Sequence, residues 1–171
     1  MPKADDLPIL RTKLLIPELR YNYVSREGLL DALDERSFGY VVLICGPAGY
    51  GKTTLAAEWA RMHGTSIAWL SLEDSDNDVD DFTRYFAAVL EPILNDDQLG
   101  GKIQDKANGN SPGNTLHTLI VHLINVTTQD DVQVTLVLDN FQLITQEQIL
   151  AEIDFLLNHL PPHLRLFLLT R

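Results

Sequence analysis

A glycine-rich segment, Gly46–Thr53, carries the strongest chemical signal in the sequence. It reads GPAGYGKT and fits the pattern G-x-x-x-x-G-K-S/T at every fixed position. Glycines in such a loop let several backbone N–H groups point at one phosphate, because a Cβ would obstruct them. We expect Lys52 to lie along the β- and γ-phosphates of a nucleotide, Thr53 to offer its hydroxyl to Mg²⁺, and Thr54 to bind the α-phosphate. The predicted phosphate-binding residues are Gly46, Pro47, Ala48, Gly49, Tyr50, Gly51, Lys52, Thr53 and Thr54.

An acidic partner for the metal is predicted at Asp139. The apolar run 134–138 leads directly into it, and a carboxylate at the carboxyl end of a buried parallel strand lies beside the phosphate loop. We expect Asp139 to hold Mg²⁺ through water. The next residue, Asn140, is the catalytic candidate at this position, but an amide can orient a water molecule without being able to take its proton. Glu73 and Asp74 are alternative carboxylates, although a solvated acidic loop explains them more simply.

Arg171 follows the last predicted strand, 164–169. In sheets of this class that strand often lies between the strand before the phosphate loop and the strand before Asp139. An arginine at its tip can reach the γ-phosphate and bind it by charge and fork geometry. From the residues alone, a γ-phosphate sensor and an ordinary surface arginine are equally good interpretations.

Strands and helices alternate around these motifs. Helical spacing of apolar residues predicts helices at 26–36, 52–63, 82–94, 116–126 and 146–160, and apolar runs predict strands at 40–45, 66–71, 134–138 and 164–169. The run 40–45 is typical of a strand buried on both faces, and we expect Cys45, Trp59 and Trp69 in the core. Residues 95–114, rich in Asp, Gly and Asn, are predicted to form a mobile loop. The pattern indicates an α/β fold with a parallel sheet covered on both faces.

Composition narrows the possible partners. The 171 residues include 24 Asp and Glu against 13 Lys and Arg, for a net charge of -11, which argues against nucleic-acid binding by this chain. No apolar run approaches the roughly 20 residues that span a bilayer, so no membrane partner is expected. The single cysteine excludes an internal disulfide and fits a reducing, cytoplasmic compartment. The acidic alternation after Asp74 lacks the Gly and Glu of a calcium loop, and the histidines lack zinc spacing.

These motifs together resemble the MalT-like, large ATP-binding LuxR-family transcription regulators, which belong to the STAND class of signalling ATPases. The resemblance covers nearly the whole chain. Its segments are Lys13–Pro17, Val24–Arg26, Gly46–Leu55 with Trp59, Ala68–Glu73, Asp76–Asp78, Leu136–Phe141 and Leu168–Arg171.

The resemblance implies binding of ATP or ADP, with ATP and an inducer favouring a self-associating, active form. Val24 and Arg26 match the family segment that approaches the base and sugar, and Arg171 matches the γ-phosphate-sensing arginine. The family's usual second Asp after the metal ligand is Asn140 here, so slow hydrolysis at most is expected. The family's fifth strand, helical repeats and DNA-binding module would follow Arg171, so we expect a fragment that binds DNA only through a missing module.

We therefore predict a three-layer P-loop NTPase fold with a mostly parallel sheet in the order 2-3-4-1. An N-terminal arm at 1–24 precedes the P-loop domain at 25–171, which is expected to lack its fifth strand and to leave strand 40–45 as an open edge. The leading hypothesis is an ATP/ADP switch of a signal-responsive transcription regulator. A turnover NTPase or small-molecule kinase is one alternative, although no acceptor site is recognisable. A non-binding interaction module is the other. No Asn-Lys-x-Asp motif supports a GTPase.

Overall fold

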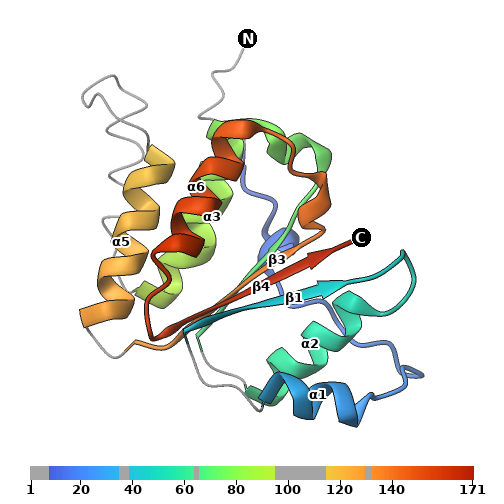
Figure 1. The fold of residues 1–171 in the computed structure, drawn as a ribbon. Helices are drawn as coiled ribbons and strands as arrows, with labels where there is room; N and C mark the ends of the chain where they lie inside the picture. The colour runs from blue at the N-terminus through green and yellow to red at the C-terminus, as the bar shows by residue number, and fades with distance from the viewer. Residues whose placement is uncertain (1–7, 35–38, 64–65, 95–114, 130–131) are drawn as a thin grey trace.

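A four-stranded parallel sheet forms the centre of the molecule. The computed structural model describes residues 8–34, 39–63, 66–94, 115–129 and 132–171, so the predicted loop 95–114 lies outside the described residues. The strands lie side by side and run in the same direction (Figure 1). Their order is β1-β4-β3-β2, which confirms the predicted order. The strands are β1 (Tyr40–Cys45), β2 (Ile67–Ser71), β3 (Val134–Asp139) and β4 (Leu164–Thr170).

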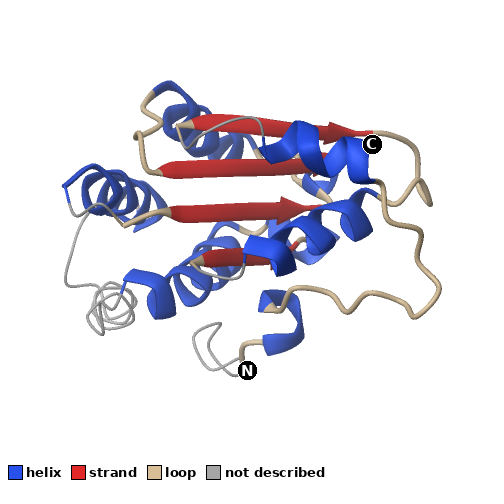
Figure 2. Ribbon diagram, turned by 90° about the horizontal axis from the view of Figure 1, so that it is seen from below, coloured by secondary structure: helices blue, strands red, loops and turns tan. Residues whose placement is uncertain are grey.

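Helices cover both faces of the sheet, which gives the three layers that the sequence predicts. On one face lie α1 and α2, and on the other lie α3, α5 and α6 (Figures 1 and 2). Parallel strands need such crossovers, because each new strand must start at the same end of the sheet as the last. The helices are α1 (Glu27–Asp34), α2 (Lys52–His63), α3 (Val79–Leu94), α5 (Thr115–Gln129) and α6 (Glu147–Asn158).

The two central strands, β3 and β4, send alternate side chains into two apolar cores. Leu136 and Leu166 join the core beneath α3, α5 and α6, whereas Val137 and Phe167 join the core beneath α1 and α2. The period of two in a strand accounts for this division. The second core also contains Trp59 and Trp69, both buried, as their interpretation as packing residues requires.

Strand β1 corrects one prediction. The apolar run 40–45 is typical of a strand buried on both faces, yet every second residue of β1 is exposed. Leu43 is 63% exposed, and the predicted core residue Cys45 is also exposed. The reason is that β1 is an outer strand, and the core beneath α3, α5 and α6 takes its strand residues from β2, β3 and β4. Only the side of β1 that bears Val42 and Ile44 packs, against the α1 and α2 core.

Helix α3 begins earlier than the apolar spacing predicts. A short 3-10 helix, η3 (Asp74–Asn77), lies within the predicted acidic loop 73–81, and α3 starts at Val79. The side chain of Asp78 explains this start, because its Oδ1 accepts hydrogen bonds from the N–H groups of Asp80 and Asp81, each at 3.0 Å. A carboxylate at this position satisfies N–H groups that have no partner within the helix.

The chain before α1 is held against the sheet by a buried lysine. It contains the 3-10 helix η2 (Arg11–Leu14), which packs against β2. Lys13 is 5% exposed, and its Nζ lies 2.5 and 2.6 Å from the two carboxylate oxygens of Asp76, which is 1% exposed. The same ammonium lies 4.2 Å from the ring centre of Tyr85. This contact fixes the arm at one point, from which it runs towards the phosphate loop.

Within the described residues, no helix combines the length and the apolar character needed to cross a membrane.

Candidate nucleotide-binding site

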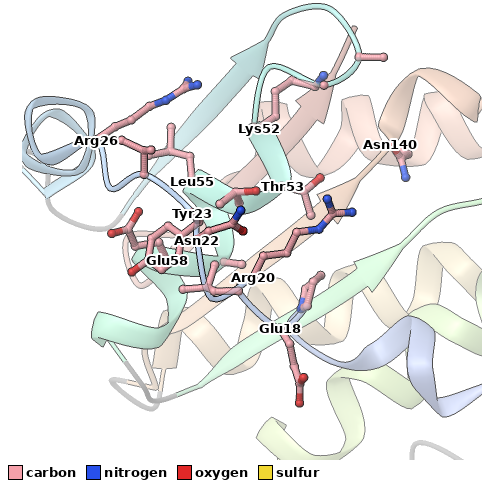
Figure 3. Close-up of a pocket in the computed structure, with 18 of the residues that line it drawn as sticks. Glu18, Arg20, Asn22, Tyr23, Arg26, Lys52, Thr53, Leu55, Glu58 and Asn140 are labelled. Atoms are coloured by element: carbon pink, nitrogen blue, oxygen red, sulfur yellow. The ribbon is translucent and has the colours of Figure 1, made fainter.

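A cavity of about 770 Å³ lies where the arm, the phosphate loop and the carboxyl ends of β3 and β4 meet (Figure 3). In the close-up, Lys52 and Asn140 lie towards one side, and Glu58 and Tyr23 lie towards the other. Three parts of the chain line the cavity. The segment before α1 contributes Pro17, Glu18, Leu19, Arg20, Asn22, Tyr23, Val24 and Arg26, and the strand ends contribute Asn140 and Arg171. The loop and α2 contribute Ala48, Gly49, Gly51, Lys52, Thr53, Thr54, Leu55, Ala57 and Glu58.

The phosphate loop needs glycine at two of its positions. Gly49 and Gly51 have φ angles of 81° and 76°, in the left-handed region that other residues rarely adopt. Gly51 also has a close neighbour, because a Cβ placed on it would lie 3.5 Å from Nη2 of Arg26. The guanidinium of Arg26 therefore lies over the loop. Helix α2 begins immediately afterwards at Lys52, so its N-terminal N–H groups and positive dipole end adjoin the loop.

Lys52 folds back over the loop. Its Nζ donates to the carbonyl oxygens of Gly46 at 2.6 Å and Pro47 at 3.0 Å. An ammonium group has three donors and prefers charged oxygen partners. The two carbonyl contacts hold the positive charge at the mouth of the loop, where phosphate oxygens would be its strongest partners.

Thr53 and Asp139, the predicted metal pair, are in contact. The Thr53 hydroxyl lies 3.1 and 3.0 Å from the two carboxylate oxygens of Asp139. Asp139 is buried at the end of β3, and its Oδ1 also accepts the backbone N–H of Asn140 at 2.9 Å. The β3 strand and the start of α2 thus bring together groups that are 86 residues apart in the sequence.

The electrostatic environment of Asp139 favours a cation nearby. Burial raises the pKa of its carboxyl above the ordinary value, and this is the largest influence on it. The Thr53 hydroxyl, the Asn140 N–H and the Lys52 charge act in the opposite direction on this pKa. A buried carboxylate is costly without compensating positive charge, so a divalent ion beside Asp139 would relieve this cost.

Asn140 lies at the turn that follows β3. Its φ of 60° and ψ of 36° place it in the left-handed region, which asparagine tolerates better than most residues. It lines the cavity together with Arg171, which follows β4. Because β4 lies between β1 and β3, Arg171 is carried to the side of the cavity between the phosphate loop and Asp139.

The structure brings most of the predicted site residues to one cavity. Val24, Arg26, Asn140 and Arg171 line it. Some loop residues do not line it. Gly46 and Pro47 instead accept the Lys52 hydrogen bonds, and Tyr50 is 63% exposed. Asp139, at the end of β3, does not line the cavity either, but it contacts Thr53, which does.

Sequence reasoning missed two groups of lining residues. The first is the arm segment 17–23, which carries no motif by itself. The second is the continuation of α2 through Leu55, Ala57 and Glu58. Helical spacing could have found the second group, because residues three and four positions after Thr54 lie on the same face of a helix.

The residues present fit a nucleotide with Mg²⁺. The loop offers a glycine-lined cradle with an ammonium group over it, and Thr53 and Asp139 supply the oxygen ligands that Mg²⁺ prefers. Within the described ranges, no three His, Cys, Asp or Glu side chains gather to hold a metal ion. Mg²⁺ here would therefore depend on phosphate oxygens for the rest of its shell, as is usual in phosphoryl-transfer sites.

The family comparison agrees with this arrangement. The family model described as "AAA ATPase domain" matches residues 25–169, and the chain belongs to that family. It is a P-loop ATPase domain of the α/β class.

Curated relatives of the chain include transcription regulators named MalT. The chain is 31% identical over 161 residues to the "HTH-type transcriptional regulator MalT" of Vibrio campbellii, covering 94% of this chain and 17% of the relative. It is 33% identical over 166 residues to MalT of Yersinia pestis, covering 95% of this chain and 18% of the relative. The chain thus spans less than a fifth of the length of these relatives.

Proposed function

We propose that this chain is an ATP/ADP-binding switch domain that holds the nucleotide with Mg²⁺ in the cavity beside Lys52. The observation that carries the proposal is the contact of Thr53 with Asp139 next to a glycine loop covered by the Lys52 ammonium. Metal ligands and phosphate ligands then lie together at the carboxyl ends of the strands, as binding of a Mg²⁺-nucleotide requires.

Each predicted residue has a role in this proposal. Backbone N–H groups of the loop and Thr54 bind the α- and β-phosphates, while Lys52 lies between the β- and γ-phosphates. Thr53 binds Mg²⁺ directly, and Asp139 binds it through water. Val24 and Arg26 lie at the base and sugar. Arg171 senses the γ-phosphate and so distinguishes ATP from ADP by charge.

Slow hydrolysis, or none, accompanies binding. Asn140 is the polar side chain next to Asp139 on the cavity wall, and its amide can orient a water molecule but cannot accept a proton from it. A slow reaction suits a switch, because the bound state must persist long enough to be read by the rest of a protein. Lys52 and Arg171 would stabilise the charge of the transferred phosphoryl group.

The relatives' printed name suggests what the switch controls. We propose that the nucleotide state of this domain regulates transcription in the cytoplasm and, with ATP, favours self-association of the intact regulator. The net charge of -11 makes this chain unsuited to DNA, so contact with DNA is assigned to another part of such a regulator.

Calorimetric titration tests the binding proposal. Wild type is titrated with ATP and with ADP, with and without Mg²⁺, and compared with Lys52→Ala and with Arg11→Ala as a control for loss of an exposed positive charge. We expect binding by wild type and Arg11→Ala, and a loss of at least about 100-fold in Lys52→Ala, since the ammonium makes charged hydrogen bonds to two phosphates.

Phosphate release measured in the same samples separates the alternatives. A folded wild-type chain that binds neither nucleotide would contradict the switch and favour an interaction module. Turnover of several per second, on the scale of ordinary enzymes, would instead favour a turnover NTPase or kinase.

A further inference from the structure

Glu58 is a mostly buried residue whose carboxylate opens onto the cavity and has no protein partner among the described residues. It lies on α2, is 8% exposed and lines the cavity. Among the residues that the structure describes, it makes no hydrogen bond or ion pair. No part of the phosphate or metal chemistry described above uses it.

The other buried carboxylates of the described residues show how unusual this is. Asp76 is paired with Lys13, and Asp139 accepts hydrogen bonds from Thr53 and Asn140. The Glu58 oxygens reach the cavity instead, where they have no protein donor and are free to accept a hydrogen bond from a ligand. A ligand that brings a hydrogen-bond donor into the cavity would satisfy Glu58.

The position of Glu58 on α2 indicates which part of a nucleotide it meets. It follows Lys52 by six residues, which is about 9 Å along a helix axis at 1.5 Å per residue. Thr54 and Leu55 lie four and three residues before it, on the same helix face. With the phosphates over Lys52 and Thr54, Glu58 lies beyond them, where Figure 3 draws it near Tyr23 and Asn22 of the arm.

We propose that the Glu58 carboxylate accepts a hydrogen bond from the exocyclic 6-amino group of adenine and so selects adenine nucleotides. This inference rests on the proposed nucleotide site. An ionised carboxylate only accepts hydrogen bonds, so it needs an N–H or O–H donor on the ligand. A base with a carbonyl oxygen at position 6 would face Glu58 with a second acceptor and would be disfavoured.

A cycle that changes the residue and the ligand together tests the contact. The full chain, as wild type and Glu58→Leu, is titrated with ATP, with purine riboside triphosphate, which lacks the 6-amino group, and with 2′-deoxy-ATP. Glu91→Leu, an exposed position on α3, is the matched control. Glu58→Gln keeps the side-chain shape and serves if the leucine variant fails to fold, which thermal unfolding reports.

We expect wild type and Glu91→Leu to bind purine riboside triphosphate about 10-fold or more weakly than ATP. The reason is that this ligand lacks the amino group that donates a hydrogen bond to the charged Glu58 carboxylate. Glu58→Leu should bind the two ligands with similar affinity, and Glu58→Gln should show a smaller preference than wild type. The preference for ATP over 2′-deoxy-ATP should be unchanged by either substitution.

Two results would overturn the inference while leaving the proposed function intact. One is wild-type binding of ATP with no preference for the amino group. The other is a preference for the 2′-hydroxyl that disappears in Glu58→Leu, which would place Glu58 at the ribose. Failure of wild type to bind any of the three ligands would instead contradict the nucleotide site itself.

Discussion

At the phosphate end of the cavity, the functional groups come from one loop, the first turn of α2 and the tips of two central strands. At the opposite end they come from the continuation of α2 and from an arm that lacks a regular strand or α-helix over residues 15–26. The first end is positioned by the buried strands β3 and β4. The second depends on a distant anchor, the pair of Lys13 with Asp76, and on Arg61, whose Nη2 donates to the Pro17 carbonyl at 3.1 Å.

The two ends of the cavity are therefore assembled in different ways. At the phosphate end, one continuous loop and the first turn of α2 lie against the ends of two buried strands. The arm end is assembled through contacts between distant segments, so its shape can vary without disturbing the loop. Nucleotide affinity therefore has two contributions that substitutions should be able to separate.

One short turn supports both ends. Asp76 of η3 holds Lys13 of the arm, while the neighbouring Asn77 holds the segment that follows Asn140. The Asn77 Nδ2 donates to the Leu143 carbonyl at 2.6 Å, and its Oδ1 accepts the Thr145 N–H at 2.7 Å. The two ends are thus independent in their ligand contacts but share a support.

Loss of the arm anchor should produce the largest effect on stability. Lys13→Met leaves the buried Asp76 carboxylate without its charge partner, and breaking a buried pair in this way costs about 3–5 kcal/mol. Denaturant unfolding of the ligand-free chain measures this cost. The double variant Lys13→Met with Asp76→Leu should recover much of it, and a double variant as unstable as the single one would contradict the pairing.

Asp139→Asn should weaken the Mg²⁺-dependent binding of ATP but stabilise the ligand-free chain against unfolding. Because burial raises its pKa, the folded chain binds more protons than the unfolded chain between the unfolded and folded pKa values. The contribution of Asp139 to stability therefore falls as pH rises through that interval, and the charged carboxylate is destabilising at neutral pH.

We therefore expect Asp139→Asn to raise the melting temperature of the ligand-free chain at pH 7. The gain should shrink as the pH is lowered towards about 4, the ordinary value for Asp. The same substitution should remove most of the Mg²⁺-dependent part of ATP affinity. Calorimetry with and without Mg²⁺ and thermal unfolding across pH check both, and a lower melting temperature at pH 7 would contradict the electrostatic account.

Asn140→Asp should change the rate of hydrolysis without affecting the arm end. A carboxylate at this position can accept a proton from water, and general bases contribute about 100-fold or more to such rates. Aspartate also tolerates the left-handed backbone found here. Phosphate release in single-turnover conditions reports the effect. An unchanged rate at unchanged ATP affinity would show that a proton acceptor at position 140 is not what limits the reaction.

Arg171→Ala should have the smallest effect, confined to the difference between ATP and ADP. The side chain is exposed, so solvent weakens its interaction with a γ-phosphate. We expect ATP affinity to fall several-fold and ADP affinity to stay the same, as measured by paired titrations. Equal losses for both nucleotides would mean that Arg171 does not read the γ-phosphate.

Motifs and hydrophobic patterning predicted most of the fold and the phosphate end. The loop Gly46–Thr53 could be found because its glycines and lysine have fixed spacing, and Asp139 because it ends an apolar run. Strand order followed from the architecture of the class. The exposure of Leu43 and Cys45 was not predicted, although strand 40–45 was expected at an open edge, because its continuous apolar run is typical of a strand buried on both faces.

The arm end could not be predicted for a different reason. Lys13 and Asp76 are 63 residues apart, and neither residue type suggests burial. Their pairing exists only in the folded chain, where η2 packs on β2. Glu58 was not predicted because the phosphate-loop motif ends at Thr54, one helical turn before Glu58.

The separation of the two ends is tested most directly by titrating wild type and Lys13→Met with ATP and with inorganic tripolyphosphate, at a temperature where both proteins are folded. Tripolyphosphate can use the groups of the phosphate end, namely the loop, Lys52, Thr54, Arg171 and Mg²⁺, whereas ATP also needs the arm. We predict that Lys13→Met binds tripolyphosphate within about twofold of wild type but binds ATP about 10-fold more weakly. Equal losses for the two ligands, or no loss for ATP, would contradict the account.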